Sequence, residues 1–176
     1  MVARSMPKQK PGRSKQTYAT PQIFIDAVEK RFGKLDFDLA ASPANAKADS
    51  YYTARQNALT CDWIAGPKGE EYRASYTCWL NPPYSYLLPW IRKCDRERHL
   101  LTSGQILVLV PASVGSTWFR DWVWNKASVY FLDERISFIS NQPYPKDLML
   151  LRYRKPSLST PITIWSWRAD KLIKQR

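Results

Sequence analysis

The sequence predicts an α/β domain with a mostly parallel β-sheet and antiparallel strands at one edge. Helix-like and strand-like segments alternate up to about residue 132, which is the order expected when helices connect parallel strands. Residues 106–110 form an unbroken apolar run, typical of a strand buried on both faces of a sheet. After residue 132 strand-like segments dominate, so we expect the antiparallel strands to come from the end of the chain.

The helical elements begin with a segment at about residues 20–33. Thr20 is expected to cap this helix and Pro21 to occupy its first helical position. Apolar residues then recur at helical spacing up to Phe32, and Gly33 suits the C-terminal end. Two further helices are expected at about 88–101 and 117–125.

The strand-like segments are short. In addition to 106–110, strands are expected at 35–39, 76–80, 129–132, 136–138, 148–152 and 162–167. Residues 44–69 are irregular, with only weak alternation around residues 51–53. The first strand ends in Ala40-Ala41-Ser42-Pro43, whose small side chains would let a ligand approach the backbone closely.

Length and charge limit the possible functions. The chain has 176 residues, which fits one domain. It carries 27 Lys and Arg against 15 Asp and Glu, a net charge of +12, so a polyanion is the expected partner. Nucleic acid is the first candidate and an anionic membrane surface the second. No apolar run approaches the ~20 residues that span a bilayer, and no secretory signal is recognisable.

The first 16 residues differ in composition from the rest. They contain five basic residues, no acidic residue and little apolar surface, so we expect a flexible basic arm over 1–16 and a single domain over 17–176. The arm is interpreted either as a segment that follows DNA or as a solubilising tail.

Metal binding is not expected. Cys61, Cys78 and Cys94 are widely spaced, and His99 is the single histidine. No spacing typical of a zinc site occurs, so we expect three reduced thiols.

The motif with most chemical content is Asn81-Pro82-Pro83-Tyr84, directly after an expected strand. Open α/β sheets build their sites at such strand ends. The two prolines fix the backbone and orient the Pro82 carbonyl, while the Asn81 side-chain oxygen adds a second acceptor. Tyr84 adds an aromatic plane. Two acceptors beside a ring suit a planar group that carries an amine, such as adenine, although a simple strand-ending turn is the alternative.

Several segments around this motif occur in an order that resembles the phage DNA N6-adenine methyltransferase (Dam) family. The resemblance covers residues 17–153 and is carried by five groups of residues: 18–22, 35–43 with 45–47, 62–63, 79–84, and 110–112 followed by 118–119. It implies a Rossmann-like class I methyltransferase fold, S-adenosylmethionine as the methyl donor, and the N6 amino group of adenine in double-stranded DNA as the acceptor. It also implies a phage or prophage protein that acts in the bacterial cytoplasm.

The resemblance also implies roles for individual residues. Asn81 and Pro82 would hold the target amine and Tyr84 would stack on the base, with Pro83 completing the catalytic motif. The implied cofactor-contacting residues are Thr20, Pro21, Asp38, Ala40 and Asp62. A plain structural reading, as a helix cap, a turn cap or a surface turn, is also open for Thr20, Pro21, Asp38 and Asp62. Ala40-Ala41-Ser42 stands where many methyltransferases have a Gly-rich loop.

Binding of duplex DNA would require extrusion of the target adenine from the base stack. We expect phosphate contacts from the N-terminal arm and from Arg135, Arg152, Arg154 and Lys155. Loops at about 65–75 and 140–146 are expected to read a short or degenerate target sequence. The oligomeric state is not indicated.

Two other functions fit the motif. One is methylation of an RNA amine or of a protein glutamine amide, which poses the same planar-nitrogen problem. The other is a catalytically inactive DNA-binding protein of the same fold. The net charge favours nucleic acid over a protein substrate.

Overall fold

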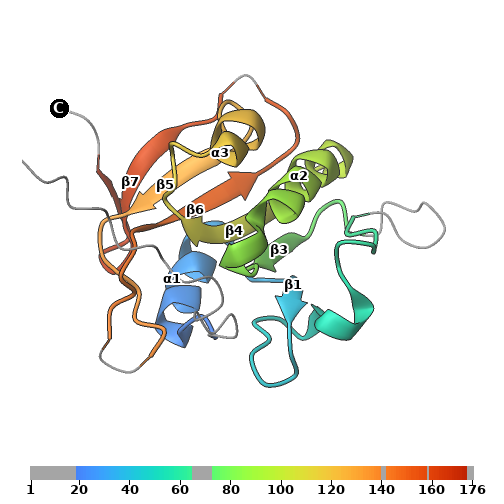
Figure 1. Cartoon of the computed structure of the whole chain (residues 1–176), viewed down its shortest axis with the longest axis horizontal. Coiled ribbons are helices and arrows are strands. Elements are labelled where there is room, and N and C mark those ends of the chain that lie inside the picture. Colours follow the sequence, from blue (N-terminus) through green and yellow to red (C-terminus); the bar gives the residue numbers. More distant parts are fainter. Residues whose placement is uncertain (1–18, 65–72, 140–141, 158, 174–176) are drawn as a thin grey trace, which may run out of the picture.

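The computed structural model describes residues 19–64, 73–139, 142–157 and 159–173 (Figure 1). The helices in this part are α1 (Gln22–Phe32), α2 (Leu87–Glu97) and α3 (Thr117–Trp122). The strands are β1 (Phe37–Ala41), β2 (Ser50–Thr53), β3 (Thr77–Leu80), β4 (Gln105–Pro111), β5 (Ser128–Leu132), β6 (Leu148–Tyr153), β7 (Ile162–Ser166) and β8 (Lys171–Ile173). Short 3-10 turns cover Ala54–Gln56, Tyr84–Tyr86 and Arg98–Leu100.

The described strands form one sheet in the order β2-β1-β3-β4-β6-β5-β7-β8. Neighbouring strands from β2 to β4 pair in parallel, as do β5 and β7. Strand β6 is antiparallel to both β4 and β5, and β8 is antiparallel to β7. The predicted α/β fold with a mostly parallel sheet is confirmed, and it is Rossmann-like. The antiparallel strands belong to the C-terminal half of the chain, with β8 at the edge and β6 inside the sheet.

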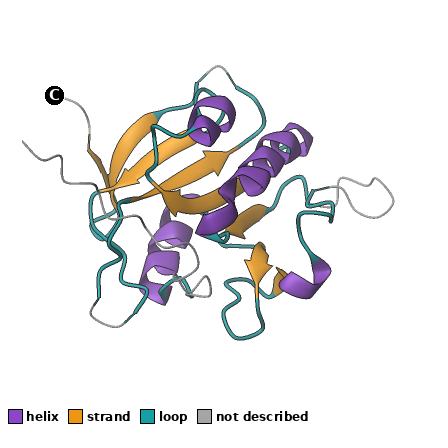
Figure 2. Cartoon of the chain, in the orientation of Figure 1, coloured by secondary structure: helices purple, strands orange, loops and turns teal. Residues whose placement is uncertain are grey.

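The helices cover the sheet on both faces (Figure 2). Helix α1 packs on one face against Trp79, Leu107 and Trp165, whereas α2 and α3 pack on the other. Strand β4 is fully buried, and its side chains alternate between the two cores. This arrangement explains the unbroken apolar run, since a strand covered on both faces needs apolar residues at every position.

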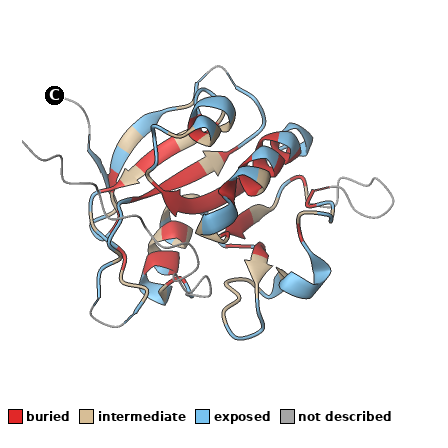
Figure 3. Ribbon diagram, viewed as in Figure 1, coloured by how far each residue is buried: buried red, intermediate tan, exposed pale blue. Residues whose placement is uncertain are grey.

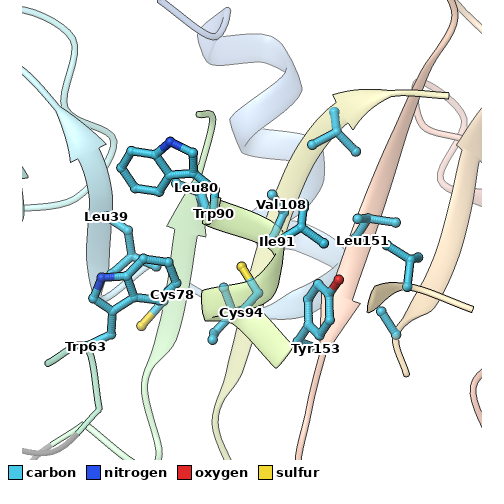
Figure 4. Close-up of a cluster of buried hydrophobic side chains, with 14 of the residues drawn as sticks. Leu39, Trp63, Cys78, Leu80, Trp90, Ile91, Cys94, Val108, Leu151 and Tyr153 are labelled. Carbon is cyan, nitrogen blue, oxygen red and sulfur yellow. The ribbon is translucent and has the colours of Figure 1, made fainter. Parts of the chain in front are cut away.

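The larger core lies between the sheet and α2 (Figure 4). Ile91 and Cys94 of α2 pack on Cys78 and Val108 of the sheet, and all four are inaccessible to solvent. Burial on this face fixes α2 directly behind the strand end that carries the Asn-Pro-Pro-Tyr motif.

The structure corrects two local expectations. Pro21 itself lies at the N-cap of α1, which starts at Gln22, and Thr20 makes no capping bond there. Residues 136–138 do not form a strand. The Ile136 side chain is buried on the α1 side of the sheet, and its carbonyl accepts a bond from the Tyr144 amide (2.8 Å) within the same loop. Strands β2 and β8 were not expected as strands.

Gly104 provides a test of this packing. A Cβ built on Gly104 would lie 2.5 Å from the Tyr76 carbonyl oxygen and 2.7 Å from that of Ala74, so backbone would have to move. We expect Gly104→Ala to lower the free energy of unfolding by about 2 kcal/mol, the usual cost of overpacking. Urea denaturation measures it.

Gly115→Ala is the matched control. Nothing lies within 4 Å of a Cβ at Gly115, so we expect a change below about 0.5 kcal/mol. Equal effects of the two substitutions would contradict the close approach at Gly104.

Candidate active site

The candidate site lies at the carboxyl ends of β1 and β3. Strand β1 pairs with β2 on one side and with β3 on the other, so the strand order changes direction across the sheet at β1 while the strands remain parallel. Ligands of open α/β sheets bind in the crevice outside such a switch point. Asp38 of β1 is aligned with Trp79 of β3, which brings the loops that follow the two strands side by side.

A cavity of about 670 Å³ occupies this position. Its wall includes residues of β1 and the following loop, the end of β3, and Trp90 of α2. The volume falls in the range of small-molecule sites. Thr20, Asp38, Ala40, Asn81 and Pro83 all line it, so the structure brings together most of the residues predicted for the site.

Asn81 is held by Thr20. The Asn81 side-chain amide Nδ2 donates to Thr20 Oγ1 at 3.1 Å, and Thr20 is buried, with 3% of its surface exposed. This bond orients the amide, so that Oδ1 remains as an acceptor to which no described residue donates. Thr20 therefore serves the site through Asn81, a role that the helix-cap interpretation did not contain.

Tyr84 forms an aromatic cluster with two residues of the loop between β5 and β6. Its ring lies edge-on to Tyr144, with centroids 6.0 Å apart, and Tyr144 lies edge-on to Phe138 at 5.4 Å. The Tyr84 hydroxyl is enclosed, and within the described residues it has no hydrogen-bond partner. Burial raises the pKa of Tyr84 well above its usual range, so the phenol is neutral.

Phe138 and Tyr144 were not identified from the sequence as site residues. Tyr144 falls in the loop that was expected to read the target, but Phe138 was assigned to a strand. Neither position belongs to a periodic pattern. The contact of Tyr144 with Tyr84, and of Phe138 with Tyr144, depends on the path of the whole loop.

Asp38 organises the loop after β1. Its Oδ1 accepts from the Ala40 amide (3.1 Å) and its Oδ2 from the Lys47 amide (3.0 Å). Burial raises the pKa of Asp38 to about 6, and these two backbone bonds and the Lys47 charge only partly oppose it. At neutral pH the carboxylate is ionised and ties both ends of the loop to β1.

The same loop explains how the site dispenses with a Gly-rich segment. Asn45 Oδ1 accepts from the Ser42 amide (2.6 Å) and from the Ser42 hydroxyl (2.9 Å), which closes a tight turn. None of residues 40–47 has a positive φ, so no position there requires glycine. The small side chains of Ala40, Ala41 and Ser42 would be sufficient for a ligand to approach the backbone closely.

Two predicted cofactor-contacting residues lie outside the cavity wall. Pro21 caps α1, and Asp62 is exposed, with its main-chain carbonyl accepting from the Tyr52 hydroxyl (3.0 Å). Pro82 is buried beneath the motif.

The predicted DNA-contacting residues divide into two groups. Arg135 is paired with Asp147 (3.3 Å), directly before β6 and beside the carboxyl ends of the parallel strands. Arg152 is aligned with Leu107 near the start of β4, and Arg154 and Lys155 follow it. They lie where the parallel strands begin, opposite the carboxyl ends that carry Asn81; these two sides are called the far edge and the Asn81 edge below. The structure therefore does not bring these three residues to the Asn81 edge.

Other expectations concern segments outside the described residues, namely the arm over 1–16, residues 65–72 of one recognition loop and residues 140–141 of the other. Within the described residues, no group of His, Cys, Asp and Glu is suited to hold a metal ion, and no helix is long and apolar enough to cross a membrane. Cys61, Cys78 and Cys94 are free thiols.

Asp38 predicts a pH dependence of stability. Its pKa is raised from 3.8 to about 6 in the folded chain, so the folded state binds the proton more tightly than the unfolded state. Stability contributed by this group therefore increases as the pH falls through 6. Between pH 7 and pH 5 the gain is about 1 kcal/mol.

Thermal unfolding of the cofactor-free protein at pH 7 and pH 5 measures this effect. We expect Asp38→Ala to lose the gain, and Asp36→Ala to keep it. The assignment would be contradicted if the change in stability from pH 7 to pH 5 were less favourable in the wild type than in the Asp38→Ala variant.

Comparison with known proteins identifies the family. A family model described as DNA N-6-adenine-methyltransferase (Dam) matches residues 8–147. The DNA N-6-adenine-methyltransferase of Haemophilus phage HP1 is 33% identical over 130 residues, covering 73% of this chain and 69% of the phage protein. That of Escherichia phage T1 is 30% identical over 124 residues, covering 70% of this chain and 47% of its own length.

A solved structure of lower similarity is the protein-(glutamine-N5) methyltransferase of Alicyclobacillus acidocaldarius. It has 12% identity and a TM-score of 0.37, with 76% of this chain and 91% of that chain covered. The residues matched by the family model include the β1 loop, the Asn81 motif and the loop after β5. The chain belongs to the DNA N-6-adenine-methyltransferase (Dam) family.

Proposed function

We propose that this protein transfers a methyl group from S-adenosylmethionine to the N6 amino group of an adenine in double-stranded DNA. The observation that carries the proposal is the Thr20–Asn81 bond, because it orients the side-chain amide of a residue in the cavity wall and leaves its oxygen as an acceptor. Family membership and the net charge of +12 support DNA as the substrate.

The chemistry requires activation of a weak nucleophile. The N6 lone pair of adenine is delocalised into the ring, so the amine reacts poorly. If Asn81 Oδ1 and the Pro82 carbonyl each accept one N6 hydrogen, the nitrogen becomes more pyramidal and its lone pair more localised. No strong general base is then required, and positioning of the amine is the main contribution of the protein.

The cavity fits the proposed cofactor. The small residues Ala40, Ala41 and Ser42 leave the backbone open, and the ionised Asp38 fixes their loop. Trp79 and Trp90 provide aromatic surface in the same cavity. When bound, S-adenosylmethionine supplies an electrophilic methyl group. These residues would hold it beside Asn81, where the acceptor amine is presented.

The aromatic cluster is the proposed binding place of the adenine ring. An extruded base loses stacking worth a few kcal/mol and must recover it in the enzyme. Tyr84, Tyr144 and Phe138 offer such a surface beside Asn81. Arg135 lies on the same loop, so we assign it, ahead of Arg152, Arg154 and Lys155 at the opposite edge, to a flanking phosphate.

Transfer of labelled methyl from S-adenosylmethionine tests the proposal. Duplex DNA, RNA and a glutamine-containing peptide are offered in parallel, and we expect label only in N6-methyladenine of the duplex. Label in RNA or in the peptide would favour the corresponding alternative. Duplex binding without cofactor binding, measured by calorimetry, would identify an inactive DNA-binding protein.

The catalytic motif is tested by substitution. We expect Asn81→Ala to reduce kcat about 10²-fold or more, as for loss of a transition-state hydrogen bond. Tyr84→Ala should reduce kcat/KM by about 10- to 100-fold, because stacking on the base is lost. Single-turnover methylation of duplex DNA measures both.

Tyr84→Phe is the control for the ring. It removes only a hydroxyl that lacks a partner among the described residues, so we expect activity within about threefold of the wild type. Normal activity in Asn81→Ala would contradict the proposed site, provided that cofactor binding and thermal stability are unchanged.

Thr20 is tested as a positioning residue. Thr20→Val removes the acceptor for Asn81 Nδ2 and keeps the side-chain shape, so we expect kcat to fall about 3- to 10-fold, the value of one neutral hydrogen bond. The affinity for S-adenosylmethionine should change less than kcat. Thr20→Ser should restore kcat, and equal kcat values for Val and Ser would show that the bond does not serve catalysis.

A further inference from the structure

We propose that a stripe of cations on the outer side of α2 and at the far edge of the sheet binds the nucleic-acid backbone away from the methylated base. The stripe consists of Arg92, Arg96, Lys126, Arg154 and Lys155, and is called the basic stripe below. The inference rests on the proposed function for its choice of DNA, but its test measures binding and does not require methyl transfer.

The stripe begins beside the catalytic motif. Arg92 and Arg96 are four residues apart on α2, so they share one helix face, and both are exposed. Helix α2 as a whole has both buried and exposed parts (Figure 3). Together with Tyr86, which follows the motif by two residues, they line a hollow of about 750 Å³. Arg92 follows Tyr84 by eight residues, so the first cations of the stripe lie on the helix that directly follows the site.

The carboxylates of α2 do not neutralise the stripe. Glu97 is buried and pairs with Lys93 (3.0 Å) and Arg96 (3.3 Å). Asp95 is also buried and pairs with Arg98 (2.7 Å) and Lys126 (3.4 Å). Each carboxylate is shared by two cations, so each group keeps a surplus positive charge.

Trp122 connects the two parts of the stripe. The Arg92 guanidinium lies 5.2 Å from the Trp122 ring centroid and the Lys126 ammonium lies 4.7 Å from it. Lys126 also lines a cleft of about 110 Å³ at the opposite edge of the sheet. The cations therefore continue from the helix face into that cleft.

The far cleft is built to receive an anion. Arg152 is fixed there by a bond from its Nε to Gln105 Oε1 (2.6 Å). Arg154 and Lys155 are exposed in the wall, and no described carboxylate pairs with either. Thr160 adds a hydroxyl group, whereas the Ser157 hydroxyl donates to the Ser159 carbonyl (3.0 Å). Guanidinium, ammonium and hydroxyl donors without a carboxylate are the usual surroundings of a phosphate.

The amount of charge favours a polyanion over a single phosphate. Helix α2, the stripe and the cleft together contain eight cations and two buried carboxylates, Asp95 and Glu97. The difference is six positive charges, half of the +12 of the chain. The cations are Arg92, Lys93, Arg96, Arg98, Lys126, Arg152, Arg154 and Lys155. Helix α2 alone is 11 residues long, roughly 16 Å at ~1.5 Å per residue. At ~3.4 Å per base pair, this length corresponds to about five base pairs of duplex.

The salt dependence of duplex binding tests the stripe. The double variants Arg154→Gln/Lys155→Gln and Arg92→Gln/Arg96→Gln each remove two positive charges. We expect each to reduce the magnitude of the slope of log Kobs against log[salt] by about 1 to 2, since each lost phosphate contact reduces it by about 0.9. The kcat at saturating duplex should stay within about twofold, because neither pair lines the cavity.

Lys34→Gln/Lys171→Gln is the matched control. Both lysines are exposed, neither pairs with a described carboxylate, and the same charge is removed. The proposal requires this variant to retain the wild-type slope. It is overturned if the stripe variants retain that slope too, or if all three variants lower it equally, which would indicate only a general effect of net charge. If the stripe variants lower the slope but the wild-type protein does not methylate DNA, the proposed function is rejected and the basic stripe is supported.

Discussion

Parallel pairing between β1 and β3 is the contact on which the whole site depends. Only two aligned pairs, Phe37 with Cys78 and Asp38 with Trp79, define this register. All four residues are buried, between α1 on one face and α2 on the other. Because the two strands end at the same edge, the Ala40 loop and Asn81 open into one cavity. A slip of one residue would turn every side chain of one strand to the other face and separate these groups.

Polar groups in the cavity wall are mostly occupied with one another. Asp38 uses both oxygens to hold the ends of its loop, Asn45 closes the turn within that loop, and Thr20 holds the Asn81 amide. The internal bonds fix the cavity before any ligand arrives and leave Asn81 Oδ1 as an acceptor. Preorganisation of this kind lowers the reorganisation that accompanies reaction, which is where a positioned amine gains most.

Sequence patterns were sufficient where local chemistry determines the structure. The apolar run of β4, the helical spacing of α1 and α2, and a rigid Asn-Pro-Pro-Tyr turn after a strand are all properties of neighbouring residues. Phe138 and Tyr144 were missed because the cluster that they form with Tyr84, through Tyr144, depends on how a loop returns to the sheet. Arg135 and Arg152 were predicted as members of one set of phosphate contacts, but the edge on which a residue lies depends on the direction of its strand.

The antiparallel direction of β6 explains why Arg135 and Arg152 lie at opposite edges of the sheet. Strand β6 is antiparallel to β4 and β5, so it starts at the edge where they end and ends at the edge where they start. The loop that precedes it, with Tyr144 and Arg135, therefore lies beside Asn81 and can serve the proposed base pocket. The loop that follows it, with Arg154 and Lys155, lies at the far edge and can serve the basic stripe. One reversed strand thus places cation-bearing loops at both edges of the sheet, where the two proposed contacts with DNA would form.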